Sequence, residues 1–267
     1  MAPRLRIARL AQEGRPFYAL LDEADDRTVR TLACDPFAGG DPDAWLRAAG
    51  APRSAPGLRW LTPCAPSKIV CVGRNFHAHI AEMGSEPPAE PLLFLKPPSA
   101  LLPHRGAIHL PPESRRVDYE GELGIVIGRE ARRVGEARAL DHVLGYTCVN
   151  DVTARDLQKR DIQFTRAKGF DTFCPLGPCL ATGLLPDEME IETRVNGERR
   201  QGAPIARMIF GVARLVSYVS QVMTLLPGDV IACGTPEGVG PLAAGDEVSV
   251  EISGIGALVN SVAVAAG

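Results

Sequence analysis

The 267-residue chain lacks the features of several protein classes. Its net charge is only −3, from 29 basic and 32 acidic residues, so it offers no strong field to attract nucleic acid or an anionic membrane. No apolar run approaches the roughly 20 residues that span a bilayer. No apolar segment of the kind that a signal peptide requires follows the arginines near the N-terminus. These absences predict a globular protein with neither a nucleic-acid partner nor a membrane partner.

The seven cysteines form no pattern of a redox or zinc motif. No Cys-x-x-Cys pair is present, and no spacing of cysteine and histidine suits zinc. The cysteines are odd in number and scattered along the chain. We therefore expect small buried apolar side chains in a reducing compartment, which predicts a cytoplasmic location.

Strand patterns dominate the chain. Residues 1–62 contain three strand-like runs and a short helix, and they end in a proline-rich stretch, which predicts a small variable N-terminal domain and linker. Residues 63–267 contain further strands, the hairpin turn signal Asn196-Gly197, and one long helix with apolar residues at helical spacing before Pro227. The pattern predicts a mainly β protein of the α+β class, because a doubly wound sheet would need more helices.

Two acids lie on one face of a strand-like stretch, VDYEGELGIVIG. Glu120 and Glu122 are two residues apart, and two carboxylates about 4 Å apart repel by roughly 4 kcal/mol at an effective dielectric near 20. One acid therefore keeps a proton, a cation lies between them, or the strand end is solvated. Asp151 ends another strand, where it is either a third ligand or the N-cap of a helix beginning near Thr153. Three carboxylates without cysteine or histidine suit Mg²⁺, Mn²⁺ or Ca²⁺.

Other candidates for chemistry follow the same reasoning. His79 and Glu82 are three residues apart and share a face of a helical turn, as a general base with its orienting carboxylate does, or as a surface ion pair does. Lys168 precedes a loop rich in glycine and proline and is a candidate cation, although a lone lysine usually faces solvent. The stretch GTPEGVG predicts a tight turn that offers backbone N–H groups and the Thr235 hydroxyl to an anion.

The order of these motifs is similar to that in the fumarylacetoacetate hydrolase family. The resemblance rests on GRNFHAHIAEMG, YEGELGIVIG, NDVTARDLQ, AKGFDTFCPLGP and LLPGDVIACGTPEGVG, and it covers about residues 65–262. It implies a mixed β-roll catalytic domain at residues 63–267 and a homodimer. It also implies that the acid pair lies under a divalent cation.

The resemblance also implies roles for individual residues. The metal ligands would be Glu120, Glu122 and Asp151, holding Mg²⁺ or Mn²⁺. The catalytic residues would be His79 and Glu82, carried on a lid, together with Lys168 beside the substrate. The residues that contact substrate would be Arg74, Gln158 and Thr235.

Family members act on small 2-oxo acids, and the resemblance implies several reactions at one metal site. The first expectation is hydrolysis of a C–C bond in acylpyruvate-type 2,4-dioxo acids, such as fumarylpyruvate, through an enolate, with water deprotonated by His79. The alternatives are isomerisation of a hydroxymuconate-type diacid and decarboxylation of a 2-oxo diacid such as oxaloacetate. Such reactions belong to the catabolism of aromatic compounds. A non-catalytic oligomeric binding protein is the alternative from another class.

Overall fold

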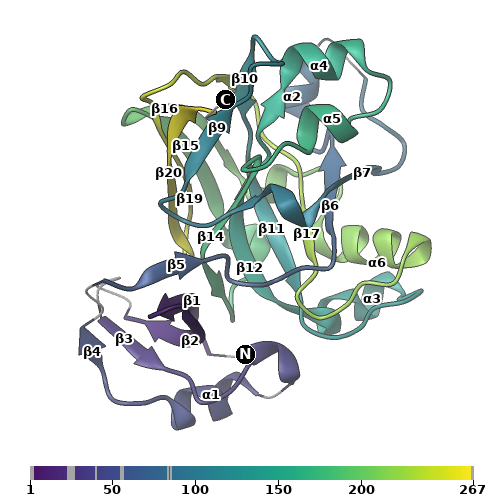
Figure 1. The fold of residues 1–267 in the computed structure, drawn as a ribbon. Helices are drawn as coiled ribbons and strands as arrows, with labels where there is room; N and C mark the ends of the chain where they lie inside the picture. The colour runs from purple at the N-terminus through teal and green to yellow at the C-terminus, as the bar shows by residue number, and fades with distance from the viewer. Residues whose placement is uncertain are drawn as a thin grey trace.

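The fold is mainly β, as the sequence predicts, and its strands form three sheets (Figure 1). The structure is a computed structural model, and it describes residues 3–22, 28–39, 41–54, 57–82, 84 and 86–265. Within these residues, no helix has the length and apolar character needed to cross a membrane.

The largest sheet has twelve strands in the described part of the chain. Its main path runs in the order β4-β3-β2-β1-β14-β12-β11-β17-β6-β7, while β5 pairs with β1 and β8 pairs with β14. The strands are β1 (Arg6–Gln12), β2 (Arg15–Leu21), β3 (Thr28–Thr31), β4 (Arg53–Ser54), β5 (Arg59–Leu61), β6 (Ile69–Gly73), β7 (Leu92–Lys96), β8 (Leu101–Leu102), β11 (Gly121–Ile127), β12 (Val143–Asn150), β14 (Cys174–Ala181) and β17 (Val230–Ala232).

The two smaller sheets pack at the other end of the molecule from the N-terminal strands (Figure 1). One has the order β13-β10-β18 and the other β16-β15-β19-β20-β9. Their strands are β10 (Val117–Tyr119), β13 (Thr153–Ala154) and β18 (Gly240–Pro241), and then β9 (Ala107–Leu110), β15 (Glu190–Val195), β16 (Glu198–Pro204), β19 (Glu247–Ile252) and β20 (Gly256–Val264).

The helices are few and short. They are α1 (Pro42–Ala48), α2 (His77–Glu82), α3 (Glu136–Ala139), α4 (Arg155–Arg160), α5 (Thr165–Lys168) and α6 (Val212–Val222). The apolar spacing before α6 begins at Ile209, but the helix begins only at Val212, because Gly211 before it has an extended backbone as the N-cap. The predicted hairpin turn joins β15 to β16, and both of its central residues, Asn196 and Gly197, have positive φ.

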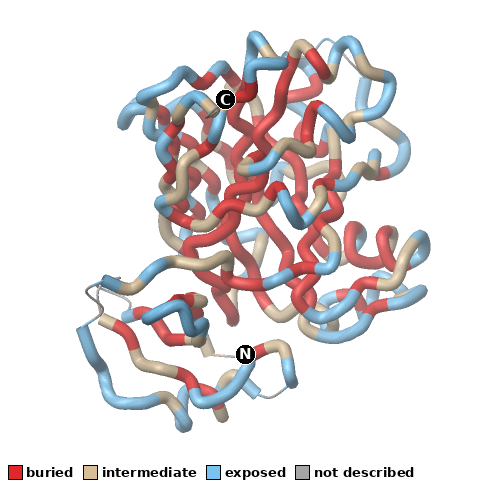
Figure 2. The backbone as a smooth tube through the Cα atoms, in the orientation of Figure 1, coloured by how far each residue is buried: buried red, intermediate tan, exposed pale blue. Residues whose placement is uncertain are grey.

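The core follows the central strands, which appear as continuous buried segments in Figure 2. All seven residues of β11 are buried, because β11 lies between β12 and β17 and both of its faces pack against apolar side chains. Six of the seven cysteines are buried there as expected, whereas Cys34 is exposed. Strand β11, which carries Glu122 and directly follows Glu120, is therefore paired with a neighbouring strand on both sides.

The N-terminal strands continue the large sheet. Strand β1 pairs antiparallel with β14, and Arg6 and Ile7 lie opposite Ala181 and Leu180. The main-chain pairing thus crosses the position at residue 62 where the sequence predicts a domain boundary. The separation of residues 1–62 and 63–267 into two domains stays a prediction.

Candidate metal centre

The three candidate ligands meet because of the sheet register. Strand β11 runs antiparallel to β12, with Gly121 opposite Asn150, so the residues flanking the start of β11 lie beside the end of β12. The Asp151 N–H donates to the Glu120 carbonyl at 2.8 Å, and the Asn150 side chain accepts from the Glu120 N–H at 3.0 Å. Strand β17 is antiparallel to β11 and β6 is parallel to β17, so the segments that follow β6 and β17 reach the same edge.

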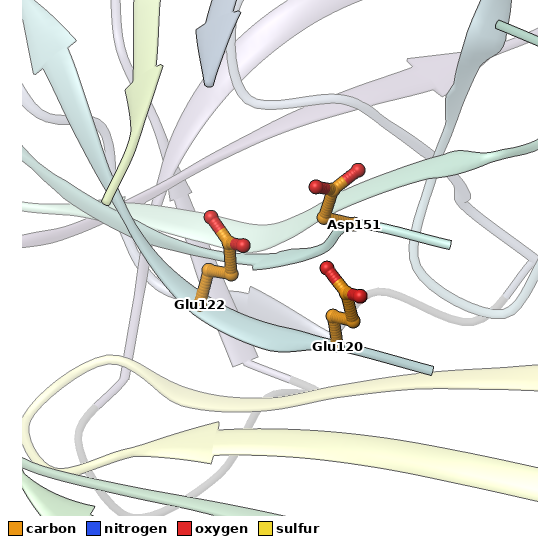
Figure 3. A group of neighbouring side chains, drawn as sticks. All are labelled: Glu120, Glu122 and Asp151. Atoms are coloured by element: carbon orange, nitrogen blue, oxygen red, sulfur yellow. The ribbon is translucent and has the colours of Figure 1, made fainter. Parts of the chain in front are cut away.

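The three carboxylates face one another from the two chain segments (Figure 3). Ligand oxygens of Glu120, Glu122 and Asp151 all lie within 4.8 Å of one another, and all three residues are buried. The alternative role for Asp151 as an N-cap is wrong, since α4 begins at Arg155 and its N-cap is Ala154. Solvation of the acids is excluded by their burial.

Cations compensate two of the three acids. Lys168 Nζ lies 2.9 Å from Glu120 Oε2 and 2.6 Å from Asp151 Oδ2, and Arg155 pairs with the other oxygen of Glu120. Burial raises the pKa of Glu120, but Lys168 and Arg155 outweigh it and hold this pKa well below its usual range. For Lys168, burial lowers the pKa. The carboxylates of Asp151 and Glu120 outweigh this effect, so the pKa of Lys168 is raised above its usual value. The lysine is therefore buried and charged, not solvent-facing.

Glu122 has much weaker compensation. Its Oε2 accepts a hydrogen bond from the Gly234 N–H at 2.8 Å. Burial, followed by repulsion from Asp151 and Glu120, raises the pKa of Glu122 well above its usual value. Asp151 Oδ1, in addition, accepts no hydrogen bond, although the Lys96 ammonium lies 2.8 Å from it. Three carboxylates that converge in one buried cluster, with Glu122 weakly compensated, fit a divalent cation, which the three acids together could hold.

The histidine and glutamate candidates form a pair on α2. His79 Nδ1 lies 3.4 Å from Glu82 Oε2, and the ring is buried while Glu82 is partly exposed. Both oxygens of Glu82 also accept from the Gly238 N–H, at 3.3 and 3.2 Å. Since a carboxylate only accepts, Nδ1–H is the donor in this pair, which leaves Nε2 as the ring nitrogen not bound to Glu82. A surface ion pair does not describe this buried imidazole.

The three residues predicted to contact substrate differ in whether their side chains already form hydrogen bonds within the protein. Arg74 is exposed and has a positive φ of 58°, a conformation that is uncommon for a residue with a side chain. Gln158 Oε1 accepts from Arg155 at 2.7 Å. The Thr235 hydroxyl donates to the Gly121 carbonyl at 2.8 Å and accepts from Gln201. The sequence predicted that the Thr235 hydroxyl and the backbone N–H groups of this turn would be available to an anion. In the structure, the hydroxyl and the Gly234 N–H instead form hydrogen bonds within the protein.

These side chains line one cavity of about 200 Å³, and every predicted site residue except Glu82 is among its lining residues. The residues that line it are Val72, Gly73, Arg74, His79, Leu92, Phe94, Glu120, Glu122, Asp151, Arg155, Gln158, Lys159, Phe164, Lys168 and Thr235. A larger cavity of about 660 Å³ lies between the N-terminal strands and the segment around Ser253, and it contains none of the predicted residues. The smaller cavity is the candidate site, because the acids and the histidine converge there.

Two basic residues of the cavity were not predicted. Arg155 donates to Asp118 and Glu120, and Lys159 lies on the same helix, α4. Both follow Asp151 in the stretch NDVTARDLQK, so the sequence motif could have predicted that they lie near the site. The ion pairs of Arg155 could not have been predicted, because they depend on how α4 packs against β10.

Comparison with known proteins identifies this architecture. Residues 68–263 match the family described as fumarylacetoacetate (FAA) hydrolase C-terminal, and residues 5–63 match one described as Rv2993c-like, N-terminal. The chain belongs to the fumarylacetoacetate hydrolase family. Its members include hydrolases, isomerases and tautomerases, so an enzyme is indicated while the reaction is left open.

Curated relatives cover most of the chain. Protein Rv2993c of Mycobacterium tuberculosis is 46% identical, over 97% of this chain and 98% of the relative. The oxaloacetate tautomerase YisK of Bacillus subtilis is 44% identical, over 74% of this chain and 70% of the relative.

Solved structures show the same fold. A 5-carboxymethyl-2-hydroxymuconate delta-isomerase from Mycobacterium smegmatis superposes with a TM-score of 0.88 at 42% identity, over 97% of this chain and all of that one. A fumarylpyruvate hydrolase from Pseudomonas aeruginosa, in complex with Mn²⁺ and pyruvate, has a TM-score of 0.69 at 35% identity, over 74% and 90%. Relatives of this fold therefore bind a divalent metal.

Proposed function

We propose that this protein moves a proton within a small 2-oxo dicarboxylate, interconverting the keto and enol forms, with oxaloacetate as the simplest substrate. The observation that carries the proposal is that one cavity of about 200 Å³ has a cluster of three buried acids at one part and two exposed basic residues, Arg74 and Lys159, at another. The tautomerase relative and the isomerase structure, each more than 40% identical, support proton transfer as the reaction.

The exposed part of the cavity suits a second carboxylate. Arg74 and Lys159 line it, and within the described residues neither side chain forms a hydrogen bond or ion pair. Arg74 is held in its uncommon backbone conformation between β6 and α2. A 2-oxo diacid would place its 2-oxo acid end toward Glu120, Glu122 and Asp151, and its distal carboxylate between the two basic side chains.

A divalent cation held by the three acids would supply Lewis acidity toward the oxo group. His79 would take a proton from the carbon next to the oxo group through Nε2, since Nδ1–H is committed to Glu82. The C–H electron pair becomes the C=C bond of the enolate, and Lys168 lies where it would stabilise the charge on the oxygen. The C=O π electron pair moves to the oxygen, and protonated His79 then returns the proton to that oxygen, which completes the enol and restores the base.

The test is the rate at which enolic oxaloacetate converts to the keto form, followed by its ultraviolet absorbance. We expect acceleration by the full-length protein with Mg²⁺ or Mn²⁺, loss of the acceleration in EDTA, and recovery when the ion is restored. No acceleration with either ion would overturn the proposal. Release of CO₂ in the same assay would identify the decarboxylase alternative.

Hydrolysis of acylpyruvates is a second candidate, favoured by the pairing of the buried His79 ring with Glu82. A histidine oriented by a carboxylate suits deprotonation of water as well as of carbon. Incubation with acetylpyruvate and Mg²⁺ would release pyruvate and acetate if hydrolysis occurs. Absence of pyruvate, together with tautomerisation of oxaloacetate, would limit the site to proton transfer.

A further inference from the structure

Lys96 is a fully buried lysine that ends β7, only 1% exposed, beside the acid cluster. Its Nζ lies 3.0 Å from the carbonyl oxygen of Val152, 2.6 Å from that of Lys168 and 2.8 Å from that of Phe173. The same nitrogen lies 2.8 Å from Asp151 Oδ1. One ammonium group thus contacts three separate backbone segments and one candidate ligand.

The ammonium has three protons for these four oxygens. The three carbonyls accept hydrogen bonds, whereas the contact with Asp151 Oδ1 has the distance of an ion pair without the geometry of a hydrogen bond. Lys96 therefore compensates the charge of Asp151, while Oδ1 accepts no hydrogen bond. A carboxylate oxygen that accepts no hydrogen bond retains lone pairs with which it could coordinate a cation.

We propose that Lys96 is a positioning residue for the cation site. Val152 directly follows Asp151, and Lys168 closes α5, so the hydrogen bonds to their carbonyls set where the aspartate and the second lysine stand. The inference rests on the proposed function, because it assumes that Asp151 binds a cation. It adds a role for a residue that touches neither substrate nor cation.

Two effects of Lys96 oppose each other. Its positive charge near Asp151 disfavours a second cation, so removing it would tighten binding if charge alone mattered. Removing it also leaves three inward carbonyls without a donor, and those segments would shift toward other donors. The positioning effect outweighs the repulsion, because the acids must stand in one geometry around a small hard ion.

The experiment is calorimetric titration of the metal-free full-length chain with Mn²⁺, without substrate. Lys96→Met keeps the length and apolar stem and removes all three donors, and we expect Mn²⁺ affinity to fall about tenfold or more. Lys96→Gln retains two donors and should lose less. Lys68→Met is the matched control, since Lys68 pairs with the buried Asp229 outside the cavity, and it should lower the unfolding temperature without changing the affinity.

The outcomes separate this inference from the proposed function. A folded Lys96→Met protein that binds Mn²⁺ as tightly as wild type, or more tightly, overturns the positioning role. An equal loss in Lys68→Met overturns it too, because general destabilisation would then explain both. If Lys96→Met does not fold, Lys96→Gln decides by the same criteria. Failure of the wild-type chain to bind Mn²⁺ would instead overturn the cation site itself.

Discussion

Two buried aspartates, Asp229 and Asp151, have opposite environments. Asp229 is 0% exposed, and its two oxygens accept from the backbone N–H groups of Ser67, Lys68 and Leu226, from the Ser67 hydroxyl and from the Lys68 ammonium. Asp151 is 1% exposed; its Oδ2 accepts from the Lys168 ammonium, whereas its Oδ1 has no hydrogen-bond partner, although the Lys96 ammonium lies 2.8 Å from it.

The difference separates a carboxylate that serves structure from one available for chemistry. Asp229 joins the segment before β6 to the turn before β17, and its acceptors are saturated. Asp151 stands beside two further acids with part of its acceptor capacity open. Burial alone does not distinguish the two residues, whereas the supply of donors does.

The largest expected effect tests whether the two aspartates have different roles, by neutralising each one in turn. Asp151→Asn should reduce Mn²⁺ affinity by more than about a hundredfold, because the variant loses the charge of a proposed ligand. Loss of a residue that only orients a metal ligand typically costs about 10–100-fold. Asp229→Asn should leave the affinity within about twofold and cost about 2–3 kcal/mol of unfolding free energy. Calorimetric titration and urea unfolding measure the two quantities. Equal affinity losses would show that Asp151 has no special role.

The next largest effect concerns His79, the proposed general base, and separates residues needed for proton transfer from those needed for metal binding. His79→Ala should lower the rate of oxaloacetate tautomerisation by about 10²–10⁴-fold, since positioned proton transfer is worth that much. Mn²⁺ affinity should stay unchanged, because no ligand is touched. His77→Ala is the control, as this exposed neighbour on α2 lines a different cavity. A variant that retains wild-type turnover would contradict the assignment of the base.

The smallest effect lies in the metal-free protein. Glu122→Gln removes a carboxyl whose ionised form is disfavoured by burial, Asp151 and Glu120, and it keeps an acceptor for Gly234, so it should raise stability at neutral pH by about 1–3 kcal/mol. It should also abolish the thermal stabilisation that Mn²⁺ gives the wild-type chain. Thermal unfolding with EDTA and with Mn²⁺ measures both.

The same carboxyl gives the pH dependence. The folded pKa of Glu122 is raised, so its contribution to wild-type stability is present below its unfolded pKa and is lost as pH rises toward the folded pKa. Glu120 has the opposite sign: its lowered folded pKa gives stability that is lost on acidification below its unfolded pKa. Glu122→Gln should remove the loss at higher pH only. An unchanged profile would contradict the raised pKa.

Local patterns of the sequence predict much of the fold and the meeting of the site residues. Alternation at β15 and the Asn196-Gly197 turn identify a hairpin, since both signals are set by neighbouring residues. The same-face spacing of Glu120 and Glu122 and the strand end at Asp151 identify the acid cluster. The cytoplasmic location and the homodimer stay predictions.

The rest depends on packing between distant segments. Lys96 ends a strand of leucines and looks like a solvent-facing terminus, and its four oxygen partners lie 55 to 77 residues away along the chain. Arg155 lies within a recognised motif, yet its selection of Asp118 and Glu120 requires the position of α4. Local spacing carries no information on such partners.

The pairing of β1 with β14 has a consequence for how the chain is partitioned. β14 is buried along all eight residues, and β1 occupies the flank that β12 leaves open near Leu180 and Ala181. The N-terminal segment therefore extends the sheet that also contains β11 and β12, the strands that position the three acids. It is joined to the strands of the candidate site through backbone hydrogen bonds.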